Sequence, residues 1–157
     1  MNLYGFVFNN PVLYVDPFGL LTLHYWEPGG QGKDKWNGHV SITLDDGTYI
    51  SHWPASNAGY PYIFPVEART PNMALDILGE NGRQPEDIQI TDLDEKAIKT
   101  WWNNYDENFS VWNNCSDVAS EALRKGGMKI PSHIIYDPEQ VYDDVQKRLN
   151  DNKAEKK

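Results

Sequence analysis

The fold is decided around one stretch of the chain, Trp112-Asn113-Asn114-Cys115-Ser116-Asp117-Val118-Ala119-Ser120-Glu121-Ala122-Leu123. Either Asn113 or Asn114 can cap a helix that begins at Cys115, because an asparagine side chain accepts hydrogen bonds from the N–H groups of a first turn. The glycine pair at 126 and 127 ends this helix. Cys115 is the single cysteine of the chain. At a helix start it lies among unpaired N–H groups and the positive end of the helix dipole, which favour an anion.

A histidine on a predicted strand lies well upstream of this cysteine. Gly38-His39-Val40-Ser41-Ile42 is followed by Asp45-Asp46-Gly47, a strong hairpin signal, and by a second predicted strand that holds His52. If Asp46-Gly47 is a two-residue turn, Ser41 pairs with His52, and His39 and His52 share one face at roughly 7–8 Å between Cβ atoms. A three-residue turn would put the two histidines on opposite faces.

A thiol at a helix start and an imidazole on a strand are the two parts of a cysteine hydrolase or acyltransferase. In this hypothesis Cys115 is the nucleophile, His39 takes its proton, and His52 holds His39 in the reactive tautomer. The backbone N–H of Cys115 is the expected oxyanion donor, helped by a side-chain amide of Asn113 or Asn114. The alternative is structural: Cys115 is a small buried apolar residue, and the histidines carry no chemistry.

Composition narrows the classes of protein. A chain of 157 residues fits one domain with appendages, and one cysteine excludes an intramolecular disulfide and a multi-cysteine zinc site. We expect no metal and no cofactor. The net charge of −9 argues against a nucleic-acid binder. We expect no integral membrane segment and no secretory signal, because no apolar run is long enough and the first residues lack the basic and apolar regions of a signal.

The periodicity of the chain predicts an α+β domain, with a small antiparallel sheet packed against helices, over residues 21–150. The segment 54–71 is proline-rich and is expected to be a long loop that forms a groove wall or lid. Residues 151–157 are expected to be a disordered tail. The predicted strands are 21–26, 39–44, 48–53 and 86–91, with a short one at 109–112, and the predicted helices are 72–78, 94–105, 115–125 and 138–149.

The first twenty residues resemble the end of the core of Rhs (YD-repeat) proteins. The signature of that family is a proline, four residues, and then Asp-Pro-any-Gly-Leu, and its fixed positions here are Pro11, Asp16, Pro17, Gly19 and Leu20. In that family the core forms a shell around a variable C-terminal toxin, which self-cleavage after the final leucine releases. The resemblance implies that residues 21–157 are a toxin domain, delivered as a secreted effector into a target cell. The partners it implies are the parent Rhs shell and a cognate immunity protein.

The strand with His39, the strand with His52 and the helix start at Asn114-Cys115 resemble the permuted papain-like enzymes. These enzymes are relatives of NlpC/P60 peptidases and lecithin-retinol acyltransferases. In that group a strand histidine comes first, a polar residue follows on the next strand, and an Asn-Cys pair opens a later helix. Carried over to this chain, His39 is the base, His52 the third member and Cys115 the nucleophile. After Asn-Cys the acyltransferases have an acidic residue and a histidine, whereas this chain has Ser116 and Asp117.

Three functions remain open at this stage. The first is a cysteine peptidase or amidase that cleaves an amide bond in a protein or in a peptidoglycan peptide. The acidic charge weighs against the anionic cell wall. The second is a phospholipase or acyltransferase that uses the same residues on lipid, for which the aromatic segment 60–64 offers an apolar contact. The third is a papain-like scaffold that binds a partner without catalysis.

Overall fold

The structure is a computed structural model that describes residues 20–29, 38–56, 62–132 and 137–155. Four residues of the Rhs-like signature, Pro11, Asp16, Pro17 and Gly19, lie outside these ranges. Leu20 is described and is partly exposed, and the first strand begins at the residue that follows it.

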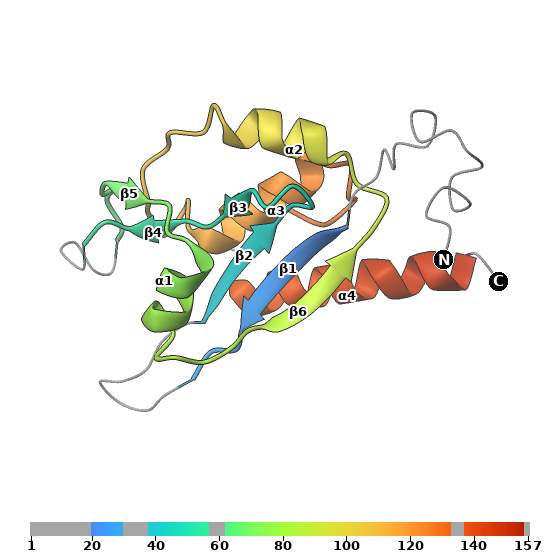
Figure 1. Cartoon of the computed structure of the whole chain (residues 1–157), viewed down its shortest axis with the longest axis horizontal. Helices are drawn as coiled ribbons and strands as arrows, with labels where there is room; N and C mark the ends of the chain where they lie inside the picture. Colours follow the sequence, from blue (N-terminus) through green and yellow to red (C-terminus); the bar gives the residue numbers. More distant parts are fainter. Residues whose placement is uncertain (1–19, 30–37, 57–61, 133–136, 156–157) are drawn as a thin grey trace, which may run out of the picture.

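Four antiparallel strands form the main sheet, in the order β3-β2-β1-β6 (Figure 1). A second, two-stranded ribbon lies partly within the segment that was predicted as a loop, and there the prediction of an irregular segment was wrong. The strands are β1 Leu21–Trp26, β2 His39–Thr43, β3 Tyr49–Ile50, β4 Trp53–Pro54, β5 Ala68–Arg69 and β6 Glu86–Ile90. The expected strand at 109–112 is a turn with isolated bridges.

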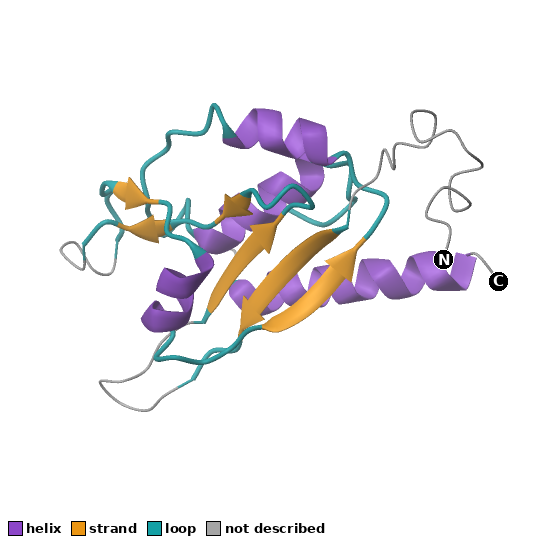
Figure 2. Cartoon of the chain, in the orientation of Figure 1, coloured by secondary structure: helices purple, strands orange, loops and turns teal. Residues whose placement is uncertain are grey.

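The helices are α1 Met73–Gly79, α2 Glu95–Trp102, α3 Cys115–Lys125 and α4 Pro138–Glu155. α3 and α4 lie behind the sheet, and α2 packs on α3 (Figure 2). The α+β class is therefore confirmed. The prediction that α4 ends near Leu149 was wrong, because the helix continues to Glu155. No glycine or proline interrupts this extension, and lysine, alanine and glutamate are good helix formers.

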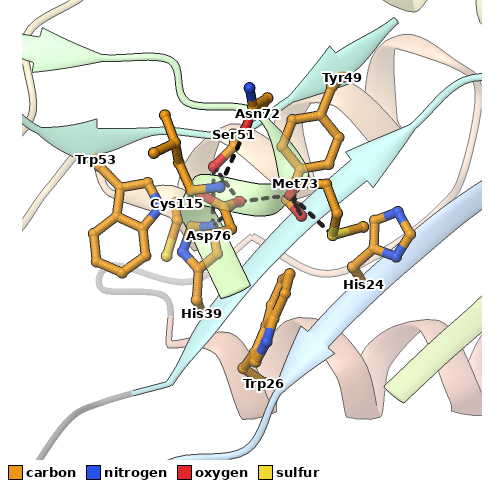
Figure 3. Close-up of polar contacts among 12 residues, drawn as sticks. His24, Trp26, His39, Tyr49, Ser51, Trp53, Asn72, Met73, Asp76 and Cys115 are labelled. Atoms are coloured by element: carbon orange, nitrogen blue, oxygen red, sulfur yellow. Dashed lines mark hydrogen bonds and ion pairs between the residues drawn. The ribbon is translucent and has the colours of Figure 1, made fainter. Parts of the chain in front are cut away.

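The two faces of the sheet differ in chemistry. The face toward α3 and α4 is apolar, and its side chains are almost fully buried against those helices. Its strand residues are Leu21, Leu23, Val40, Ile42, Ile50, Ile88 and Ile90. The opposite face carries polar and aromatic side chains, which include His24, His39 and Tyr49 (Figure 3). Ser41 belongs to the same face, because its hydroxyl bonds that of Tyr49. Packing of the apolar face anchors the sheet, and the other face is left for polar interactions.

The turn between β2 and β3 sets which residues share these faces. Leu44 N–H donates to Thr48 O at 2.9 Å, so the loop contains three residues, 45–47, and Gly47 adopts a left-handed φ of +84°. A three-residue hairpin with glycine at its left-handed position is a common solution for this length. Ile50 then pairs with Ile42 and enters the core. The two-residue turn and the register built on it were therefore wrong by one residue.

This loop generates a first prediction. Gly47→Ala should lower the free energy of unfolding by about 1 kcal/mol, because a Cβ at positive φ is strained. An added Cβ at Gly47 would meet no atom within 4 Å, so the backbone conformation alone carries the cost. Gly47→Asn is the matched control, since asparagine tolerates this region better than alanine. Urea unfolding measures both; alanine as stable as asparagine would contradict the assigned turn.

Candidate active site

A buried carboxylate organises the polar face of the sheet. Asp76 is fully buried, and its Oδ2 accepts hydrogen bonds from Tyr49 Oη at 2.6 Å, Ser51 Oγ at 2.8 Å and His39 Nε2 at 3.0 Å. Its Oδ1 accepts from Trp53 Nε1 at 2.8 Å (Figure 3). Burial alone would raise the pKa of Asp76, but the hydrogen bond and the charge of His39, followed by the Tyr49 and Ser51 hydroxyls, hold it below its ordinary value.

Asp76 comes from α1, a short helix that turns its charged residue inward. Asn72 caps the helix by accepting from Leu75 N–H at 3.1 Å. Leu75 and Leu78 are 45% and 71% exposed, whereas Asp76 is 0% exposed. This is the reverse of an ordinary amphipathic helix. Asp76 was not predicted from the sequence. The feature that could have indicated it is an acidic residue within an otherwise apolar run, Met73-Ala74-Leu75-Asp76-Ile77-Leu78.

Two tryptophan rings and two hydrogen-bonding side chains hold the His39 ring in place. Its ring lies between Trp26 and Trp53, at centroid distances of 5.5 and 4.5 Å. An ionised carboxylate only accepts, so Nε2 carries the hydrogen that points at Asp76, and this nitrogen is also 3.0 Å from Ser51 Oγ. Nδ1 is therefore the ring nitrogen left for Cys115.

The electrostatics of His39 favour its charged form. Burial of the ring works against the charge and would lower its pKa. The negative charge of Cys115, the hydrogen bonds to Asp76 and Cys115, and the charge of Asp76 outweigh burial and raise the pKa of His39 to about 9. The imidazolium is thus the form that the site stabilises at neutral pH.

Cys115 begins α3, as predicted. Asn114 is the cap, and Asp117 completes a capping box by accepting from Asn114 N–H at 3.0 Å. Cys115 is half-buried, with its thiol sulfur 3.9 Å from Ser116 Oγ, and it lies beside His39, whose pKa it affects (Figure 3). As the first helical residue, Cys115 has a backbone N–H with no intrahelical acceptor. The structure thus brings together the predicted Cys115 and His39.

The two asparagines hold the segment that leads into α3. Asn114 Oδ1 accepts from Ser116 N–H at 2.7 Å, and its amide nitrogen lies 3.3 Å from Val111 O. Asn113 donates from its amide nitrogen to Asn108 O at 2.8 Å and contacts the Tyr105 hydroxyl at 2.7 Å. Both hydrogens of the Asn113 amide are therefore engaged. For Asn113 the expected help at an oxyanion is therefore replaced by a structural role.

His52 is not the group that orients His39. The one-residue change in register turns it to the other side of the hairpin, where its ring stacks on Phe109 and meets the edge of Tyr105, each at 5.5 Å. It is 1% exposed, and its ring nitrogens lie near the backbone carbonyls of Asn108 and Asn113 without a hydrogen bond of ordinary geometry to a described residue. The expectation that His52 is the third member depended on the wrong turn, and Asp76 occupies that place.

No family model, no curated protein and no solved structure matches this chain. Within the described residues, no helix is both long and apolar enough to cross a bilayer. The same residues contain no group of three or more side chains arranged as metal ligands.

The environment of His52 predicts a pH-dependent stability. Burial, together with the positive charge of His39, lowers its pKa to about 4, although the backbone carbonyls of Asn108 and Asn113 partly oppose this. The unfolded chain binds this proton near pH 6.5, so the free energy of unfolding should rise between pH 4 and 6.5, by about 2–3 kcal/mol from this group. Urea unfolding across this range should show a smaller rise for His52→Phe. Parallel curves for both proteins would contradict this assignment.

Proposed function

We propose that the domain is a thiol hydrolase with Cys115 as nucleophile, His39 as general base and acid, and Asp76 as the residue that orients His39. The observation that carries this proposal is the placement of Cys115 at a helix start beside an imidazole whose far nitrogen is 3.0 Å from a fully buried carboxylate. A nucleophile, a base and an orienting acid in one chain of contacts are the parts that acyl transfer requires.

The chemistry follows from these positions. In the ion pair of Cys115 with a protonated His39, the thiol proton already lies on His39 Nδ1, and the Cys115 sulfur attacks the carbonyl carbon of the substrate. The Cys115 N–H donates to the oxyanion of the tetrahedral intermediate. As this intermediate collapses, His39 protonates the leaving amine or alcohol, and a thioester remains. His39 then takes a proton from water, which attacks the thioester, releases the acid and restores the thiol, while Asp76 stays ionised throughout.

The order of the residues supports a permuted papain-like architecture. His39 comes from a strand, Ser51 follows the next strand, and an Asn-Cys pair opens a later helix. Ser51 thus stands where the pattern has its polar residue, and it touches both His39 and Asp76. Ser116 is buried in the first turn of α3. Asp117 is used in the capping box, so the residues after the cysteine act in the helix start rather than as acyltransferase groups.

The biological setting that we propose is a toxin domain released from an Rhs core. The signature that ends at Leu20 supports it. The substrate is then a molecule of the target cell, and the partners are the Rhs shell and an immunity protein. A neighbouring gene for a small protein that binds this domain tightly would support the proposal without any enzyme assay.

Exposed apolar side chains near Cys115 favour a second candidate, the cleavage or transfer of a lipid acyl group. Trp112 is 55% exposed and lies three residues before Cys115, while Ile63 and Phe64 are 57% and 81% exposed. A hydrogen bond of 2.9 Å from Val111 N–H to Tyr62 O brings these two segments together. Apolar groups left in solvent beside a nucleophile suit a substrate with an apolar portion.

Loss of the thiol tests the first step of the mechanism. Cys115→Ala should abolish both toxicity on expression in bacteria and hydrolysis in lysates, because no other cysteine is present. Asp76→Asn should lower the rate about a hundredfold, since His39 loses its anionic partner. Asp87→Asn is the matched control: Asp87 also accepts from a histidine, His24 Nδ1, at 2.7 Å, outside the proposed catalytic group.

Three outcomes separate the competing functions. Full toxicity of Cys115→Ala would refute the enzyme and leave a binding scaffold. Thiol-dependent release of peptides or amino groups from protein or cell-wall digests would support the amidase, and thiol-dependent release of fatty acids from lipid extracts would support the lipid enzyme. Equal effects of Asp76→Asn and Asp87→Asn on the rate would remove Asp76 from the mechanism.

A further inference from the structure

A chain of two hydroxyl groups, those of Ser41 and Tyr49, also reaches Asp76 Oδ2. Tyr49 Oη is 2.6 Å from Asp76 Oδ2 and 2.7 Å from Ser41 Oγ. Ser41 is almost fully buried, and Tyr49 is half-buried. Neither residue was singled out as a site residue from the sequence, and the mechanism above does not use either of them.

The direction of the hydrogens in this chain follows from what each group can donate. The Asp76 carboxylate can only accept, so the single phenolic hydrogen of Tyr49 points at Asp76. The Ser41 hydroxyl must then donate to Tyr49 Oη. Burial and the hydrogen bond to Asp76 raise the pKa of Tyr49 above its ordinary value, so the phenol keeps its hydrogen at every working pH. Hydrogen bonds aligned in one direction polarise and strengthen one another.

The charged neighbours of this chain come from several elements. His39 on β2 and Cys115 on α3 lie beyond the carboxylate, and Glu80 follows Asp76 by one turn on α1. The negative charge of Asp87 on β6 opposes ionisation of Tyr49. The Tyr49 hydroxyl is a neutral donor to Asp76 Oδ2, as is Ser51 Oγ, whereas His39 is the charged donor to the same oxygen.

We propose that Tyr49, backed by Ser41, is a positioning residue that keeps Asp76 ionised and aimed at His39, and that it thereby sets the acid limit of the thiol site. The role of the pair in catalysis rests on the proposed function, whereas its control of the Asp76–His39 pair does not. Without the phenolic hydrogen the carboxylate loses one of three donors on Oδ2, binds a proton more readily and then releases His39.

The test compares the full chain with Tyr49→Phe, which removes the hydroxyl and keeps the ring. Carbon-13 NMR of labelled aspartate follows the Asp76 carboxyl, and nitrogen-15 NMR follows the His39 ring, as pH falls. The midpoint of Asp76 should rise by about half to one pH unit, and the acid inflection of His39 should move with it. Tyr142→Phe is the matched control, because it removes a hydroxyl that donates to Glu86 on the α4 side of the sheet, and it should move neither signal.

Ser41→Ala gives a second variant if Tyr49→Phe does not fold. It removes the donor behind Tyr49, and both signals should move in the same direction by a smaller amount. The proposal is overturned if neither signal moves, or if Asp76 moves while His39 stays with the wild type. These NMR readouts need no turnover, so their failure is separate from that of the thiol mechanism, which the toxicity of Cys115→Ala decides.

Discussion

The structure depends on the burial of one carboxylate, Asp76. A charged group removed from water costs several kcal/mol unless hydrogen bonds replace its hydration. Here four donors do so, from two aromatic residues, one serine and one histidine. Each donor comes from β2 or from the stretch that runs from β3 to β4, so the carboxylate ties α1 to the polar face of the sheet. The cost of leaving any of these donors unpaired makes the arrangement specific.

The register of the β2–β3 hairpin is the second constraint, because it determines which side chains lie on the apolar face of the sheet and which on the polar face. With a three-residue loop, Ile50 fills the core, while Tyr49 and Ser51 point at Asp76. A shift of one residue would expose the carboxylate to apolar side chains and place polar groups in the core. The same register sends His52 into an aromatic environment, where it remains neutral.

Much of the fold could be predicted because local signals are strong. The cap at Asn114, the cap at Asp94 and the proline that opens α4 mark helix starts, and β1 and β6 alternate clearly. The cysteine and His39 could be predicted as neighbours from their element types. α4 continues beyond its predicted end, because the charged residues that are typical of a frayed tail are also good formers of an exposed helix.

The rest of the site depended on tertiary contacts. Asp76 sits in a short helix whose periodicity says nothing about a buried acid, and its partners Ser51 and His39 lie 25 and 37 residues away from it in sequence. The turn length could have been predicted by asking which register buries Ile50, because apolar burial outweighs a preference between two hairpin loops. Asn113 and Asn114 were correctly placed at the helix start, but their amides stabilise backbone groups there.

The central claim is that Asp76 and Cys115 together hold His39 as an imidazolium. The most direct measurement is the titration of the His39 ring by nitrogen-15 NMR in the unmodified full chain. The account predicts a ring protonated at neutral pH, with a midpoint near 9 and the proton on Nε2 retained above it. A ring that is already neutral at pH 7, with a midpoint at or below the ordinary value of about 6.5, would contradict it.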